Sequence, residues 1–191
     1  MRLFLALNLP ANVRAAGHAA AAPLREVAPD LAWTAADKLH LTVKFLGEQP
    51  ETAVAPLVAA LTSVVEHHAP ALLDLGPIGA FPSWRRPRVL WLGVRPDPRL
   101  ELLHHEVETA CAGAGYPIEG RPFRPHVTLG RITPRAGAID GRALARAARG
   151  VHFRAGVSAS TLDLMLSAPA PGGTRYTRLA GIPLAGVTRR P

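Results

Sequence analysis

One short motif occurs twice in this chain and constrains its fold more than any other feature. His40 and Thr42 flank a single apolar residue, and His126 and Thr128 flank another. Because residues i and i+2 of a strand point to the same face, each segment places an imidazole and a hydroxyl on one face and apolar side chains on the other. Chance would give only about 0.5 His-x-Thr triplets at this content of His and Thr. Two copies, at positions 40 and 126 of 191, predict two similar halves that face one another.

The hydrophobic pattern around the motifs predicts an alternation of strands and helices. Strands are expected at residues 2–7, 40–46, 72–78, 89–94, 124–131, 151–154, 161–167 and 175–184. Helices are expected at 10–27, with a kink at Pro23, and at 51–68, 98–114 and 142–149. No composition shift marks a linker, so residues 1–191 are expected to form a single domain. The fold class is α+β and bilobal: two pseudo-symmetric halves have antiparallel sheets that face a central cleft, and their helices lie outside.

Charge and composition favour an anionic partner. The formal net charge is +8, and all but two of the 22 basic residues are arginine, whose guanidinium group binds phosphate in a bidentate fork. The same arginine content is also explained by a coding bias of the source. No apolar run approaches the roughly 20 residues that span a bilayer. The apolar start of the chain is interpreted as a strand and not as a signal peptide, so a cytoplasmic protein without membrane contact is expected.

The two histidines are suited to opening a cyclic phosphate. Such a hydrolysis needs one group that takes a proton from water and another that gives a proton to the departing sugar oxygen. Imidazole, with an unperturbed pKa of about 6.5, does both near neutrality. Threonine hydroxyls and an arginine would bind the non-bridging oxygens. There is no His-Glu-x-x-His motif and no close Cys/His set, so no metal is expected.

These segments resemble the two-histidine phosphoesterases, and within them the RNA 2′,3′-cyclic phosphodiesterases, also called 2′-5′ RNA ligases. The resemblance is carried by Trp33-Thr34 with residues 39–48, by Phe81 with residues 87–92, by residues 125–131, and by residues 166–173 with Tyr176. It implies a metal-independent enzyme without a cofactor, whose two sheets surround a groove where both motifs meet the phosphate. The implied reaction gives a 2′-phosphate, and its reversal joins RNA ends without ATP.

The resemblance also implies roles for individual residues. His126 would activate water and His40 would protonate the 3′ oxygen, while Thr42, Thr128 and Arg131 bind phosphate. Phe45 would line the place where the terminal base stacks, and Tyr176 would either hydrogen-bond near the phosphate or pack the last hairpin. The implied partner is RNA with 2′,3′-cyclic phosphate ends, with tRNA fragments among the candidates. A monomer is expected.

Strand alternation by itself argues against a place in the groove for two of these residues, Phe45 and Arg131. Counted from His40, Phe45 would lie on the core face, and Arg131, an odd number of residues from His126, would point away from the groove. Only a bulge or a strand end at Gly130 would turn Arg131 inward. The loop with Arg85, Arg86 and Arg88 is either a guide for RNA or simply solvated.

Three functional hypotheses remain open from the sequence. The first is the cyclic phosphodiesterase, and the second is a non-catalytic module that binds RNA ends in the same groove. The third keeps the enzyme but exchanges the substrate for an ADP-ribose cyclic phosphate or a 2′-5′-linked oligonucleotide. Two intact His-x-Thr motifs favour turnover, because binding alone needs no acid-base pair.

Overall fold

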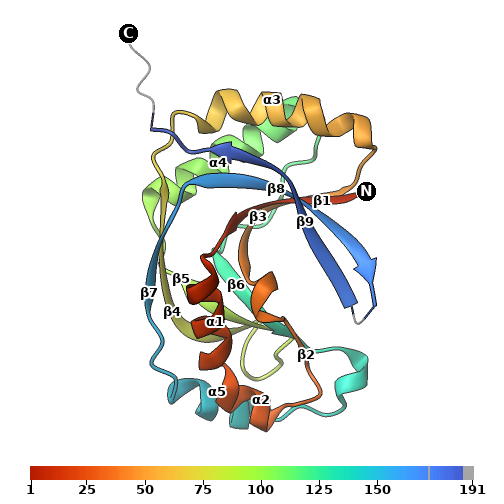
Figure 1. Cartoon of the computed structure of the whole chain (residues 1–191). Coiled ribbons are helices and arrows are strands. Elements are labelled where there is room, and N and C mark those ends of the chain that lie inside the picture. Colours follow the sequence, from red (N-terminus) through yellow and green to blue (C-terminus); the bar gives the residue numbers. More distant parts are fainter. Residues whose placement is uncertain (172, 187–191) are drawn as a thin grey trace.

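A single antiparallel sheet organises the part of the chain that the computed structural model describes, residues 1–171 and 173–186 (Figure 1). Its nine strands follow the order β7-β4-β5-β6-β3-β1-β8-β9, with the short β2 paired to β6. The strands are β1 (Arg2–Asn8), β2 (Ala32–Trp33), β3 (His40–Glu48), β4 (Ala71–Phe81), β5 (Val89–Val94), β6 (His126–Arg131), β7 (Ala155–Ala159), β8 (Thr161–Ala170) and β9 (Gly173–Pro183).

The sheet consists of two halves that meet at the two motif strands. On one side β3 is followed by β1, β8 and β9, and on the other side β6 is followed by β5, β4 and β7. The halves join where β3 pairs with β6 through Leu41 and Val127. Both of these side chains are 0% exposed, because they belong to the apolar face of their motifs. The predicted α+β bilobal fold is therefore confirmed, and its two sheets are continuous with each other.

The helices gather at the two ends of the molecule. In Figure 1, α3 (Val54–Val65) and α4 (Pro98–Gly113) lie at one end, and α1 (Ala11–Ala20), α2 (Ala22–Val27) and α5 (Gly141–Arg149) lie at the other. Short 3-10 turns are η1 (Ala36–Lys38), η2 (Glu51–Ala53) and η3 (Pro134–Ala136). One cluster of buried apolar side chains runs through both halves, so the halves share a core.

Several predicted bounds are shifted by a few residues, and the helix expected at 51–68 begins as the turn η2 before α3. Two further predictions differ more. The helix expected at 10–27 is split at Ala21, where ψ is 2°, because Pro23 has no N–H to continue the helical hydrogen bonds. The strand expected at 151–154 is wrong. This segment is not in the sheet, and β7 begins at Ala155, where pairing with Leu75 of β4 starts. The partner strand, and not local propensity, sets that boundary.

Candidate active site

His40 and His126 are each the first residue of their strand and are held in the same way. His40 Nδ1 lies 2.7 Å from the carbonyl oxygen of Lys38, and His126 Nδ1 lies 2.7 Å from that of Arg124. A carbonyl oxygen only accepts, so both Nδ1 atoms carry a proton and donate it. In the neutral imidazole this leaves Nε2 without a proton. Each motif therefore presents one Nε2 atom of fixed tautomer for proton transfer.

The threonines complete a four-residue group at the junction of the two halves. Thr42 Oγ1 lies 3.1 Å from His40 Nε2. Because β3 and β6 run antiparallel with Leu41 opposite Val127, the neighbouring positions bring His40 across from Thr128 and Thr42 across from His126. The junction thus gathers two imidazoles and two hydroxyls on the face opposite the core.

Aromatic rings surround both histidines. The ring centroids of Phe4 and Tyr176 lie 5.0 Å and 5.4 Å from that of His40, and the Tyr176 ring meets it edge-on at 88°. On the other half, the Phe81 ring lies 5.0 Å from His126 at 86°. Phe4 and Tyr176 also contact each other, at 5.1 Å. Tyr176, on the last hairpin, therefore packs against Phe4 and His40 at the site, and its hydrogen bonding near a phosphate stays a prediction.

The surroundings of both imidazoles favour their neutral forms. Burial lowers the pKa of His40, the hydrogen bond to the Lys38 carbonyl opposes this, and the charges of Arg131 and His126 lower the pKa further. Burial likewise lowers the pKa of His126, opposed by the Arg124 carbonyl and reinforced by Arg131. A bound phosphate anion would act in the opposite direction, since it stabilises the imidazolium.

A groove of about 530 Å³ opens beside these residues. Six of the seven predicted site residues line it: His40, Thr42, Phe45, Thr128, Arg131 and Tyr176. His126 does not lie on this wall, although its charge reaches His40. The groove therefore extends from the junction along the β3 half of the sheet, and His126 flanks one end of it.

Phe45 reaches the groove because β3 departs from regular alternation. Leu5 pairs with Lys44 while the next residue of β1, Ala6, pairs with Thr42, so Val43 is an extra residue. As a result Val43 and Lys44 are both buried, and Phe45 is 58% exposed. The expectation from alternation, that Phe45 belongs to the core, is wrong, because the bulge reverses the face of the residues that follow it up to the next register shift, at Leu46.

A second bulge turns Arg131 into the groove. Leu90 pairs with Gly130, but the next residue of β5, Trp91, pairs with Thr128, which leaves Leu129 as the extra residue of β6. Arg131 consequently lines the groove. This is the outcome that the sequence made conditional on a bulge or strand end at Gly130. The simple alternation argument is therefore wrong for both residues.

Other groove residues were not singled out from the sequence. They are cationic or hydroxyl side chains: Arg2, Lys38, Thr34, Ser167 and Thr174. Arg2 could have been found, because it alternates with the buried leucines of β1 and so faces the same side as Phe4. The others depend on which strands become neighbours, which local sequence does not reveal.

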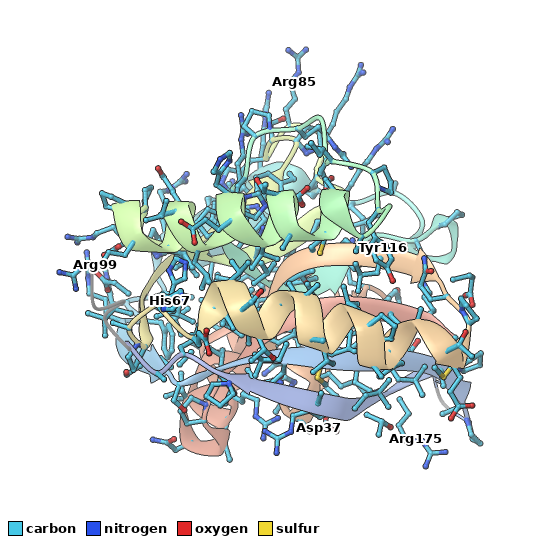
Figure 2. The ribbon with its side chains drawn as sticks, turned by 90° about the horizontal axis from the view of Figure 1, so that it is seen from above. Asp37, His67, Arg85, Arg99, Tyr116 and Arg175 are labelled. Atoms are coloured by element: carbon cyan, nitrogen blue, oxygen red, sulfur yellow. The ribbon has the colours of Figure 1, made fainter. Side chains whose placement is uncertain are left out.

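The remaining basic and metal-binding candidates lie elsewhere. Arg85, Arg86 and Arg88 do not line the groove, and Figure 2 shows the Arg85 side chain projecting away from the body of the molecule. His104 is stacked on Phe123, with ring centroids 3.9 Å apart. Among the residues that the structure describes, no group of three or more His, Cys, Asp or Glu side chains is arranged to hold a metal ion. Nor does any helix of the described part have the length and apolarity to cross a membrane.

This fold and site define a class of protein. An antiparallel sheet that joins two His-x-Thr strands at its centre, beside a cationic groove, has the architecture of a two-histidine phosphoesterase. The chain belongs to the 2′-5′ RNA ligase superfamily, whose family model matches residues 13–168.

Curated relatives and solved structures agree with this assignment. The chain is 34% identical to the RNA 2′,3′-cyclic phosphodiesterase of Escherichia coli over 93% of each chain. It is 36% identical to the protein of that name from Geobacillus stearothermophilus, over 54% of this chain and 33% of that relative. The chain spans about half or less of the length of the first curated relatives that it matches. The crystal structure of E. coli LigT complexed with 3′-AMP is similar with a TM-score of 0.73 and 32% identity, over 96% of this chain and 97% of that one.

Proposed function

We propose that this protein hydrolyses terminal 2′,3′-cyclic phosphates of RNA to 2′-phosphates by acid-base catalysis with two histidines. The observation that carries this proposal is the matched pair of imidazoles. Both are fixed through Nδ1 by the carbonyl two residues earlier, and both stand at the junction with the other motif's threonine opposite. A matched acid and base on either side of one phosphate is what ring opening needs.

The proposed reaction moves one proton at each histidine. Neutral His126 takes a proton from water at Nε2 while the water oxygen forms a bond to phosphorus. The bond from phosphorus to the 3′ oxygen breaks, and His40, protonated at Nε2, gives its proton to that oxygen. The product is a 2′-phosphate with a free 3′ hydroxyl. With a 5′ hydroxyl end in place of water, the same ring opening forms a 2′-5′ linkage without ATP: the 5′ oxygen bonds to phosphorus, its proton goes to His126, and the 3′ oxygen leaves with the proton of His40.

The other groove residues stabilise the phosphate and the terminal nucleoside. Thr42 and Thr128 donate hydrogen bonds to the non-bridging oxygens, and the guanidinium group of Arg131 balances their charge. The exposed ring of Phe45 offers a surface on which a base stacks. Tyr176 orients the His40 ring from its edge. The natural substrates would be RNA fragments with cyclic phosphate ends, including tRNA fragments, met in the cytoplasm by a single-domain monomer.

Product analysis of a short RNA that ends in a 2′,3′-cyclic phosphate tests the proposal. The purified protein is incubated with the RNA in excess chelator, beside His40→Ala and His126→Ala. We expect a 2′-phosphate product with the natural chain and a loss of about a hundredfold to ten-thousandfold with either variant, since each general acid-base group contributes about 10² to 10⁴. His104→Ala, on a histidine outside the site, is the matched control and should retain activity.

The alternatives from the sequence are outcomes of the same experiment. If the RNA binds but its cyclic end stays intact, the proposed hydrolysis is wrong and a non-catalytic binding module is favoured. Faster opening of ADP-ribose cyclic phosphate, or cleavage of 2′-5′-linked oligonucleotides in preference to the cyclic end, would reassign the substrate and keep the two-histidine chemistry.

A further inference from the structure

The groove continues well beyond the histidines, toward a row of polar residues across three strands. Arg2 of β1 pairs with Ser167 of β8, and Ser167 pairs with Tyr176 of β9. Paired residues of antiparallel strands share a face, and Thr174 lies on that face as well, two residues before Tyr176. All four residues line the groove. The ring of Tyr176 reaches back to that of His40, and Arg2, Ser167 and Thr174 continue the row away from it.

The guanidinium group of Arg2 has no bonding partner in the part of the chain that the structure describes. In residues 1–171 and 173–186, no hydrogen bond or ion pair involves the side chains of Arg2, Ser167 or Thr174. Glu48, the residue opposite Arg2 on β3, lies 3.4 Å from the amino group of Met1. None of the residues that line the groove carries a carboxylate. One cation and two hydroxyl donors are therefore available to an anion at this end.

The backbone of Arg2 lies far along the sheet from that of His40, although the rings of Phe4 and Tyr176 reach back to the His40 ring. His40 pairs with Asn8, at the opposite end of β1 from Arg2. At about 3.3 Å per residue, the six steps between Asn8 and Arg2 correspond to about 20 Å of strand, more than an arginine side chain spans. Phe45 pairs with Phe4, and this pair lies between the pair of Asn8 with His40 and the pair of Arg2 with Glu48. The order along the groove is therefore acid-base pair, stacking surface, cation.

We propose that Arg2, with Ser167 and Thr174, forms a second anion subsite that binds an RNA backbone phosphate on the 5′ side of the terminal nucleoside. This inference rests on the proposed function. When the cyclic phosphate lies at the histidines and the terminal base stacks on Phe45, the rest of the RNA leaves along the groove toward Arg2. An arginine fork with neighbouring hydroxyls matches the non-bridging oxygens of a phosphodiester. The subsite makes the enzyme selective for RNA ends over single nucleotides.

The test compares two substrates that differ by one nucleotide, whose backbone phosphate would occupy the subsite. These are adenosine 2′,3′-cyclic phosphate and the diadenosine dinucleotide that ends in the same cyclic phosphate. We expect kcat/KM to favour the dinucleotide by about tenfold or more, the size of one charge-assisted contact. Arg2→Met should bring this ratio close to one, Arg2→Lys should retain part of it, and Ser167→Ala should lower it less. In the natural chain the ratio should fall with added salt, because phosphate contacts are screened.

Arg175→Met is the matched control because it removes the same charge from the opposite face of β9. Arg175 is exposed, does not line the groove and points outward in Figure 2. It should leave the ratio unchanged. An equal ratio in the natural chain and in Arg2→Met overturns the subsite, as does an equal effect of Arg175→Met. If ADP-ribose 1″,2″-cyclic phosphate is preferred to the dinucleotide and this preference depends on Arg2, the subsite binds a pyrophosphate and the RNA assignment is wrong.

A binding measurement keeps the subsite testable apart from the reaction. Calorimetric Kd values for adenosine 2′-phosphate and for the dinucleotide that ends in a 2′-phosphate need no turnover. A preference for the dinucleotide that Arg2→Met abolishes supports the subsite even if cyclic ends are not opened, which would overturn only the proposed function. Equal Kd values overturn the subsite even if hydrolysis is fast.

Discussion

At the scale of single residues, the site depends on two imidazoles whose Nδ1 atoms are already engaged. The carbonyl groups of Lys38 and Arg124 fix the tautomer and leave Nε2 as the nitrogen available for the proposed proton transfer. The two histidines differ in their neighbours, since Thr42 Oγ1 lies 3.1 Å from Nε2 of His40. Proton transfer requires one ring to be neutral and the other to be charged at the same time, so the pH dependence of activity reports on both.

The pH profile of kcat/KM should be bell-shaped with its maximum below 6.5. The base acts only above its pKa and the acid only below its pKa, and kcat/KM reports the free enzyme. Burial first, and then the charge of Arg131, lowers the pKa of both histidines. Activity should therefore fall between pH 6.5 and 8. Arg131→Met should move the maximum upward as well as slow the reaction, while Arg85→Met should not move it. A kcat/KM that still rises at pH 8 would contradict this assignment.

At the scale of elements, a bulge in β3 determines which side chains reach the groove. The bulge turns Lys44 under the sheet, where its Nζ lies 2.8 Å and 2.9 Å from the carboxylate oxygens of Glu108 on α4. Nζ also donates to the carbonyl of Pro117 at 2.8 Å. Lys44 is 3% exposed and Glu108 is 5% exposed. This buried pair connects the strand that carries His40 and Phe45 to the helix behind it.

Removing one member of that pair should destabilise the fold strongly. Lys44→Met leaves the Glu108 carboxylate buried without its partner, which costs about 3 to 5 kcal/mol of unfolding free energy. Combining it with Glu108→Leu should recover most of the loss, because an apolar pair is often as stable as a buried ion pair. Lys38→Met, at the only other lysine, should change stability by less than about 0.5 kcal/mol. Urea unfolding measures all three, and a Lys44→Met chain as stable as the natural one would refute this role.

At the scale of the whole molecule, the two halves depend on a narrow junction. Leu41 and Val127 are the paired residues where β3 meets β6, yet the catalytic arrangement needs both strands at this place. Behind the junction the apolar core continues from one half into the other. The shared core, more than the short ladder of hydrogen bonds, holds the two motifs in register.

Shortening a buried side chain at the junction should therefore destabilise both halves together. Leu41→Ala should lower the unfolding free energy by about 2 to 5 kcal/mol through the lost burial and the cavity that remains. Leu72→Ala, at a leucine that is 56% exposed, should cost less than about 0.5 kcal/mol. Tryptophan fluorescence and circular dichroism in urea should give one coincident transition for each chain. Two separate transitions in Leu41→Ala would show that the halves unfold independently.

The sequence by itself determined the motif strands, the two-half plan and the identity of the paired imidazoles. These follow from period-two patterning and from local chemistry, since a His-x-Thr strand with apolar neighbours has only one polar face. The break before Pro23 is likewise local, because it depends on backbone groups a few residues away.

Only the tertiary structure decided where Phe45 and Arg131 point and which residues extend the groove. Bulges arise from the fit between neighbouring strands, so the extra residues Val43 and Leu129 cannot be identified from either strand alone. Arg2 and Ser167 are far apart in the chain and meet only because β1 and β8 are neighbours in the sheet. Alternation fixes the face of a side chain only within a regular strand, whereas the order and register of strands are set by packing of the whole core.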